Sequence, residues 1–380
     1  MSQRNFIQIF LMSLFVFDLG GEIGIRNIAL LIIFVDMFFL IFFSEYFSIN
    51  YRELKVFIFL FVFLVIYPFI LLFISINSGN DLALALSQTS PLFFCFIYYF
   101  YRLCGPYSNG LDNLAIAVFL LAVFYCICHL LYIFFPSAFF LIAGFIHERN
   151  AGYGGLRNDV ILLPNIYLKS SLFLSFAFSY YLLSNNKLKP FLILLGGVIT
   201  TSKALFISQF SIMFLYLRSI KFLVLFFVIF SLYFHSELLL GYYNYLMQVV
   251  TSDSVSLSKR TIDFNNMLSM FESEPERFIF GWGPGSLFYS DYFSALRSNL
   301  ELDHLNVIRK FGFIWFVVFC ICFYCLLKNL IKNKSYHIAL GFFSVFILSG
   351  TNPVLLSPLF FIIAIEIYMF TRVCKSTRSD

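Results

Sequence analysis

The chain has 380 residues and a formal net charge of +5; it is 61% hydrophobic, 21% aromatic and only 12% charged, with 56 phenylalanines. A soluble domain is about half apolar and about a quarter charged, so this composition excludes soluble and disordered proteins. The basic residues are scattered between apolar runs and form no patch, which excludes a nucleic-acid-binding protein. We therefore expect a polytopic membrane protein that forms a single integral membrane domain over residues 1–380.

Twelve apolar stretches are candidate spans, because a membrane-crossing helix needs about 20 mainly apolar residues. We expect the first stretch to stay as a span, since no small-residue cleavage site of a signal peptide follows it. The first, seventh, eighth and eleventh are short, so the expected number of transmembrane helices is 10–12. In chain order the stretches are Phe6–Leu19, Asn27–Phe43, Val56–Ile76, Ser87–Tyr101, Leu114–Phe135, Ile166–Leu183, Pro190–Thr200, Ala204–Leu217, Lys221–His235, Leu305–Leu327, Ile338–Ser349 and Val354–Thr371.

The distribution of basic residues predicts the orientation. Twelve spans place both termini on one side, and 14 of the 25 basic residues, Arg102 among them, fall in connections on that side. Because Lys and Arg concentrate in cytoplasmic loops, we expect both termini in the cytoplasm. Two acids, Asp36 and Glu366, fall inside predicted spans, and Glu366 is close enough to an inner end to reach water. No cysteine lies in an outward loop, so we expect neither disulfides nor a metal site.

Two outward connections are long, Pro136–Asn165 and Ser236–His304. Connections of this length are usually functional, although a simple tether is the alternative. In the larger one, Leu238–Val250 and Ile262–Phe271 alternate apolar and polar residues at helical spacing. This pattern predicts short amphipathic helices on the membrane surface.

The first long loop carries two arginines, Arg149 and Arg157, separated by glycines that let a chain approach a ligand closely. Forked guanidinium donors match the oxygens of phosphate or pyrophosphate. The alternative is that these arginines pair with Glu148 and Asp159 or with lipid headgroups. Lys203, in the short outward turn after the seventh span, is either a third cation for the same anion or a surface anchor.

The second long loop carries Arg260 and, where it re-enters the membrane, Glu301, Asp303 and His304. Two carboxylates and an imidazole beside cations are suited to a general base. The alternative is a solvated acidic cap on the tenth span. The glycine cluster Gly281–Gly285 is expected to be a turn and not a nucleotide loop, because no strand precedes it.

These residues, in this order and on one face, resemble bacterial O-antigen polymerases of the Wzy type and the related O-antigen ligases. The resemblance covers nearly the whole chain at the level of organisation. It implies a GT-C-like membrane fold with two functional periplasmic loops. The local matches are Arg149-x2-Gly152 followed by Leu163-Pro164-Asn165, then Thr201-Ser202-Lys203 with Lys in place of Arg, then Ser258-Lys259-Arg260 before Gly281-Trp282-Gly283-Pro284-Gly285, and finally Glu301-Leu302-Asp303-His304-Leu305-Asn306 with Arg309 and Phe311-Gly312.

One departure favours the polymerases within this group. The ligases resemble one another in a His placed eleven residues before a Gly at the last of these matches. Counted back from Gly312, that position here is Glu301, and His304 is only eight residues away. The ligase pattern is therefore not met.

The resemblance implies a polymerase that joins undecaprenyl-pyrophosphate-linked oligosaccharide repeat units at the periplasmic face of the bacterial inner membrane. Its partners would be that lipid-linked oligosaccharide, the lipid bilayer and a chain-length regulator, with no nucleic acid, no cofactor and no metal. We expect Arg149, Arg157 and Arg260 to bind pyrophosphate, with Lys203 and Arg309 behind them. Glu301 is the first candidate for the general base, followed by Asp303 and His304. The aromatic residues Trp282, Tyr289 and Tyr292 are candidate sugar-stacking surfaces.

Two alternatives stay open. One is an O-antigen ligase, which transfers finished polysaccharide to lipid A core. The other is a non-enzymatic flippase for the same lipid-linked unit, for which longer spans and internal repeats would be expected.

Overall fold

The computed structural model describes residues 3–43, 51–105, 110–157, 163–184, 186–216 and 255–376. The chain divides into two compact units, which are described separately below. Unit 1 comprises Met1–Leu114, Ser256–Ala339 and Ser349–Asp380, and unit 2 comprises Ala115–Val255 and Leu340–Leu348. The predicted ninth span, Lys221–His235, and the predicted surface helix Leu238–Val250 lie outside the described residues.

The chain is mostly helical, and its long apolar helices are compatible with the membrane protein that its composition predicts. Among the described residues, four helices are long and apolar enough to cross a membrane: Glu53–Asn77, Leu82–Cys104, Gly110–Phe134 and Asp303–Lys332. They coincide with the predicted third, fourth, fifth and tenth spans. The four stretches expected to be short are indeed shorter apolar helices: Asn5–Phe17, Leu188–Ile199, Lys203–Leu215 and Tyr336–Thr351. The larger total of 10–12 spans stays a prediction.

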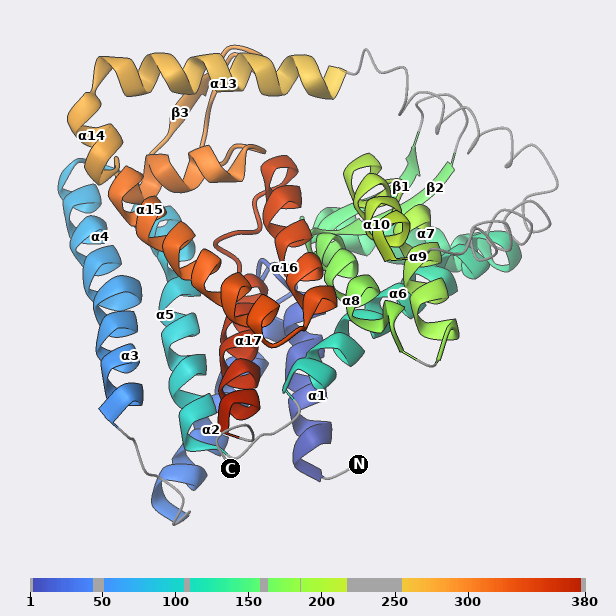
Figure 1. The fold of residues 1–380 in the computed structure, drawn as a ribbon. Helices are drawn as coiled ribbons and strands as arrows, with labels where there is room; N and C mark the ends of the chain where they lie inside the picture. Colours follow the sequence, from blue (N-terminus) through green and yellow to red (C-terminus); the bar gives the residue numbers. More distant parts are fainter. Residues whose placement is uncertain are drawn as a thin grey trace. The chain divides into compact units, whose positions relative to one another are not determined.

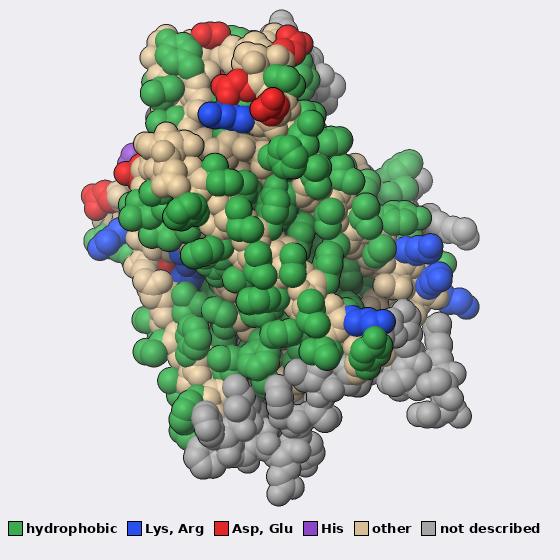
Figure 2. Space-filling model, turned by 90° about the vertical axis from the view of Figure 1, so that its left-hand side faces the viewer, with side chains coloured by type: hydrophobic (Ala, Val, Ile, Leu, Met, Phe, Trp, Pro, Cys, Tyr) green, Lys and Arg blue, Asp and Glu red, His purple; other side chains and the backbone are tan. Residues whose placement is uncertain are grey.

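Apolar side chains are exposed along these helices, as expected where lipid replaces water. Phe69 and Phe73, on the third predicted span, are both more than half exposed. Figure 2 shows a broad band of such side chains on one face, with charged side chains mainly at its margins.

Unit 1 contains most of the long helices (Figure 1). α5 packs against α2, α4 and α17, and α17 also contacts α1 and α15. α6 (Gly110–Phe134) and α16 (Tyr336–Leu348) are divided between the two units. The elements of unit 1 are α1 (Gln3–Phe17), α2 (Ile25–Phe43), α3 (Tyr51–Phe61), the π-helical η1 (Val62–Ile66), α4 (Tyr67–Asn77), α5 (Leu82–Cys104), α13 (Val255–Ser273), α14 (Pro275–Phe280), β3 (Phe288–Ser290), β4 (Ala295–Arg297), α15 (Asp303–Lys332), the 3-10 turn η3 (Ser349–Thr351) and α17 (Pro358–Ser376).

A buried ion pair joins α5 to α17. Arg102 Nε lies 2.6 Å from Glu366 Oε1, and both side chains are almost completely buried. Tyr98 also donates a hydrogen bond of 2.5 Å to the same carboxylate oxygen. Arg102 therefore lies within α5 and not in a connection, and the expectation that Glu366 reaches water is wrong: each residue neutralises the other inside the helix packing. Asp36 likewise accepts a hydrogen bond from Tyr101, at 2.7 Å.

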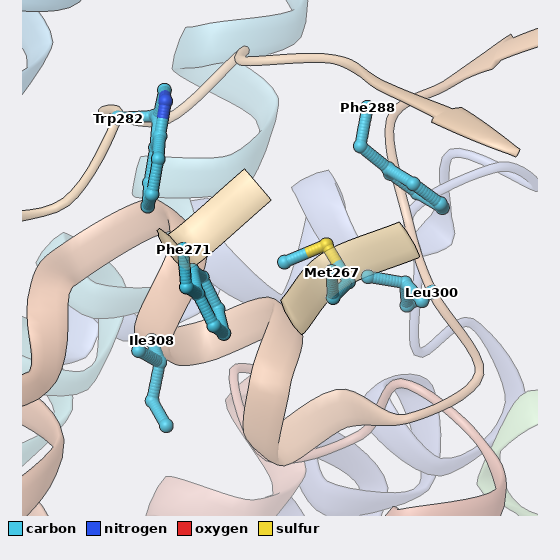
Figure 3. Packing of buried hydrophobic residues seen from close by; sticks show 6 residues of the cluster. All are labelled: Met267, Phe271, Trp282, Phe288, Leu300 and Ile308. Atoms are coloured by element: carbon cyan, nitrogen blue, oxygen red, sulfur yellow. The ribbon is translucent and has the colours of Figure 1, made fainter. Parts of the chain in front are cut away.

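The predicted helix over Ile262–Phe271 is confirmed, since it lies within α13. In Figure 1, α13 runs crosswise over the hairpin β3–β4. Met267 and Phe271 of α13 are buried in a cluster with side chains from the following loop and from α15 (Figure 3). The apolar face of α13 is thus used, at least at these two positions, to hold the large loop onto its own unit. The cluster consists of Met267, Phe271, Trp282, Phe288, Leu300 and Ile308.

A sharp kink divides α15 at Gly312, which has φ 85° and ψ 160°. Gly281, at the end of α14, has φ 93° and lies directly against this kink. A Cβ on Gly281 would lie 2.7 Å from the Gly312 nitrogen, and a Cβ on Gly312 would overlap the Ile279 carbonyl oxygen. Only glycine fits where these two backbone segments meet, because each position has a positive φ and leaves no room for a Cβ. The Gly281–Gly285 cluster is therefore a turn, as predicted, and it packs on the protein.

Unit 2 corrects one predicted span. Ile166–Leu183 was expected to be a single spanning helix, but it begins in strand β2 and becomes an α-helix only at Leu174. A short apolar run cannot by itself distinguish a strand from a buried helix. Here the strand is favoured by pairing, since Gly152 to Arg157 lie antiparallel to Leu168 to Leu163. The elements of unit 2 are α7 (Pro136–Glu148), β1 (Gly152–Arg157), β2 (Leu163–Leu168), the 3-10 turn η2 (Lys169–Phe173), α8 (Leu174–Leu182), α9 (Leu188–Ile199) and α10 (Lys203–Tyr216).

The first long connection, expected at Pro136–Asn165, is a helix followed by this hairpin. Two of its glycines pack against protein backbone. A Cβ on Gly152 would overlap the Tyr167 carbonyl oxygen, and one on Gly154 would overlap the Ala143 carbonyl oxygen of α7. Gly152 thus allows close approach to the paired strand, and Gly154 allows close contact of α7 with the hairpin.

Candidate functional site

Five of the eight predicted site residues belong to unit 1 and surround the start of α15: Arg260, Glu301, Asp303, His304 and Arg309. Three segments far apart in sequence meet there. They are the first part of α13, the residues around the start of α15, and residues 349–355, which connect α16 to α17. We refer to this region as the α13–α15 junction.

Glu301 is the centre of the charged part of the junction. Its Oε1 accepts a hydrogen bond from Lys259 Nζ, and its Oε2 lies 3.2 Å from Arg260 Nε. Arg260 also donates through Nη2 to the Thr351 carbonyl oxygen, at 3.5 Å. All three charged side chains are partly exposed, so solvent or a solute can reach them. The predicted base and one predicted anion-binding arginine are therefore in direct contact.

The other two candidate bases differ in burial. Asp303 is buried, and its Oδ2 accepts a hydrogen bond of 2.6 Å from the Leu355 backbone nitrogen. Its Oδ1 lies 3.4 Å from the side-chain nitrogen of Asn306. This places Asp303 as an anchor for the residues before α17. His304 is half-buried, and its Nε2 lies 3.4 Å from the Ser349 hydroxyl.

Arg309 lies in the interior of unit 1 and not at its surface. Its side chain is fully buried, and its guanidinium donates to the Ser286 carbonyl at 2.5 Å and the Ser298 carbonyl at 2.6 Å. A third hydrogen bond, of 2.9 Å, goes to the Asn306 amide oxygen. In this arrangement Arg309 ties the segment between Ser286 and Ser298, which contains the hairpin β3–β4, to α15. The structure thus gives it a positioning contact, whereas the sequence suggested an anion-binding one.

The hairpin β3–β4 carries several exposed aromatic side chains. Tyr289 and Tyr292 are exposed, in keeping with a sugar-stacking surface, whereas Trp282 is buried in the cluster of Figure 3. Phe293, at the tip of the hairpin, contacts two cations: Lys259 Nζ lies 4.7 Å from its ring centroid and the Arg297 guanidinium carbon 4.1 Å. The aromatic tip is therefore continuous with the charged part of the junction.

The remaining three predicted site residues belong to unit 2. Arg149 is exposed directly after α7, with its guanidinium carbon 5.9 Å from the Phe145 ring centroid. Lys203 begins α10 and is half-buried. Arg157 ends strand β1, where its backbone pairs with Leu163. Because the two units are described separately, the convergence of these cations with Arg260 and Glu301 stays a prediction.

Two parts of the junction were missed by reasoning from the sequence. In the sequence, Lys259 is only the middle residue of Ser258-Lys259-Arg260, and Ser349 is the last residue of the predicted eleventh span. A signal for Lys259 did exist, since it is adjacent to Arg260 in one short basic run. The turn at Ser349–Thr351 carries no such signal, because its contacts with Arg260 and His304 arise only in the folded unit.

The described part of the chain contains no group of three or more His, Cys, Asp or Glu side chains placed to hold a metal ion.

Comparisons of this chain with protein-family models, with curated proteins and with solved structures give no match.

Proposed function

We propose that this membrane protein is a polysaccharide polymerase that joins undecaprenyl-pyrophosphate-linked oligosaccharide units at the periplasmic face of the bacterial inner membrane. The proposal includes a GT-C-like fold of about twelve spans with both termini in the cytoplasm. The observation that carries it is the contact of Glu301 with Lys259 and Arg260. It joins two motifs that are 41 residues apart and that both belong to the family resemblance.

The reaction requires few groups. The acceptor sugar's hydroxyl oxygen attacks C1 of the donor sugar, the C1–O bond to the lipid pyrophosphate breaks, and its electron pair leaves with the pyrophosphate. Cations stabilise the charge that develops on that leaving group. A base takes the proton of the attacking hydroxyl. The leaving group is already activated, so the reaction consumes no nucleotide.

The site geometry supports some of these roles better than others. Arg260 and Lys259 are partly exposed and suited to the leaving group, and Glu301 beside them is suited to the base, with His304 as the second choice. Asp303 and Arg309 are buried and are better suited to positioning. Arg149, Arg157 and Lys203 are proposed as further pyrophosphate ligands from unit 2. Tyr289 and Tyr292 are proposed to stack against sugar rings, because they are exposed on the hairpin whose tip residue Phe293 contacts the cations.

The test is a chromosomal deletion in the host bacterium, complemented with variants and analysed by gel electrophoresis of extracted lipopolysaccharide. Deletion should leave core capped with a single repeat unit, and Arg149→Ala and Glu301→Gln should each shorten or abolish the polymer. Glu274→Gln removes an exposed carboxylate that pairs with Arg277 on the next helix, at 2.9 Å, and should keep full polymer.

Other outcomes identify the alternatives. Bare core after deletion would mean a ligase, and loss of all periplasmic lipid-linked units would mean a flippase. Full polymer with Arg149→Ala would remove the pyrophosphate assignment of that residue, and full polymer with Glu301→Gln would remove the proposed base.

A further inference from the structure

Two neighbouring cations on α13 bind one carboxylate. Lys259 contacts Oε1 of Glu301, and Arg260 contacts Oε2 at 3.2 Å, so each oxygen is held by a different cation. Consecutive residues of a helix point about 100° apart, so side chains at i and i+1 do not ordinarily share a face. Both long side chains therefore bend toward the same point. This arrangement is built around an anion with at least two oxygens.

The charges at this point do not balance. Two cations surround a single carboxylate. Arg297 adds a third cation, because its guanidinium carbon lies 4.1 Å from the ring centroid of Phe293, the same ring that Lys259 contacts. Asp263, also on α13, is buried and accepts a hydrogen bond of 2.6 Å from Ser290. Its charge offsets one further cation, so three cations still face only two carboxylates. Counted over the described contacts of Lys259 and Arg260, the junction therefore has a net positive charge. A second, larger anion could neutralise that charge.

The contact is also accessible. The exposed fractions of the Lys259, Arg260 and Glu301 side chains are 17%, 28% and 33%. Ion pairs with this degree of exposure are weak, because water solvates both partners when they separate. A phosphate has more oxygens and more charge than a carboxylate, and it suits both an ammonium and a guanidinium. Arg260 would stay in place during the exchange through its hydrogen bond to the Thr351 carbonyl oxygen.

We propose that Lys259 and Arg260 form a binding site for a phosphate or pyrophosphate group, which Glu301 occupies as a resident anion until that group displaces it. The proposal rests on the function above only for the identity of the anion, the pyrophosphate of a lipid-linked donor. Binding of the donor then has two effects at once. It places the leaving group on the cations, and it frees the Glu301 carboxylate, which can then accept a proton only when a donor is present.

The competing explanation is a static ion pair that fastens α13 to α15. The two explanations predict opposite effects of removing the carboxylate. A static anchor loses a contact and gains no affinity for anions. A resident anion, once removed, leaves a vacant site with higher affinity.

The experiment uses the full-length protein in phosphatidylcholine nanodiscs, titrated with inorganic pyrophosphate in a calorimeter. Glu301→Gln should bind pyrophosphate about fivefold more tightly than the wild type, which corresponds to the upper range for a partly exposed ion pair. The side chain of Glu301→Asp is one methylene shorter, and its affinity for pyrophosphate should lie between those of the wild type and Glu301→Gln. Lys259→Gln should bind pyrophosphate more weakly than the wild type. Glu274→Gln is the matched control, directly before α14, and should bind pyrophosphate like the wild type.

Equal or weaker binding by folded Glu301→Gln and Glu301→Asp would overturn the proposal, as would the absence of pyrophosphate binding in every variant. Repeating the titration in nanodiscs that contain phosphatidylglycerol separates two sources of phosphate. Strong inhibition of pyrophosphate binding in these nanodiscs would assign the site to bilayer headgroups. That result would also overturn the proposal. If Glu301→Gln binds more tightly but deletion of the gene leaves the cellular polymer intact, the anion site stands and the proposed polymerase fails.

Discussion

Arg309 is the residue whose replacement should disturb the large loop most. Its side chain is fully buried, and it donates to Ser286, Ser298 and Asn306. Arg309→Met keeps most of the side-chain volume but removes every donor. The Ser298 carbonyl is near solvent and can bond to water, whereas Ser286 and Asn306 are buried and would lose a partner.

The magnitude follows from those two buried acceptors. Each costs about 1–3 kcal/mol when left without a donor, which gives about 2–6 kcal/mol for both. Removal of a buried guanidinium relieves its desolvation and offsets part of this loss. We therefore expect Arg309→Met to lower the free energy of unfolding by about 2–4 kcal/mol. Arg309→Lys should lose at least as much, because it keeps the buried charge but has only one nitrogen to share among the acceptors.

The two tryptophans of the chain make the measurement possible. The Trp282 backbone nitrogen donates to the Arg309 carbonyl at 2.7 Å, and Trp315 stacks on Phe63 at 4.5 Å, beyond the kink of α15. Their fluorescence during chemical unfolding in mixed micelles should report the loss. Arg297→Met is the control, since Arg297 is exposed on Phe293 and its loss should cost less than about 1 kcal/mol. Wild-type stability of Arg309→Lys would refute the reasoning.

Two further predictions concern backbone and charge. Gly312→Ala should lower the unfolding free energy by at least about 2 kcal/mol in the same assay, through left-handed φ and overlap with the Ile279 carbonyl. Gly144→Ala, where a Cβ meets nothing within 4 Å, should instead raise the unfolding free energy by about 0.5–1 kcal/mol. If both glycine variants changed stability equally, the kink assigned to Gly312 would be contradicted. Glu366→Ala should lower the unfolding free energy by about 3–5 kcal/mol, because it removes the carboxylate that neutralises the buried Arg102 charge. Adding Arg102→Met should recover part of that loss, and a double variant less stable than the single one would argue against the buried pair.

Composition and hydropathy alone predicted a helical protein with apolar, membrane-type helices. The length of an apolar run is a local property, so four long helices and several shorter ones fall where hydropathy predicts them. The amphipathic pattern likewise predicted the helix around Met267 and Phe271. It did not predict which face of that helix packs, because the partners Trp282 and Ile308 come from elsewhere in the chain.

Local patterns failed where long-range pairing decides the outcome. Ile166–Leu183 is apolar enough for a span, yet its first residues form a strand because Gly152–Arg157 lies beside them. The glycines of both long loops were expected to serve turns or ligands. In the folded chain, Gly154 and Gly281 also allow backbone to approach backbone.

The candidate site shows the same division. The sequence supplied Arg260, Glu301 and His304 as chemically suitable groups on one predicted face. Only the tertiary structure brought Lys259 and Arg260 onto the Glu301 carboxylate and buried Arg309 among backbone carbonyls. The physical reason is that a contact across 41 residues depends on how α13 packs over α15, which leaves no periodic trace in the sequence.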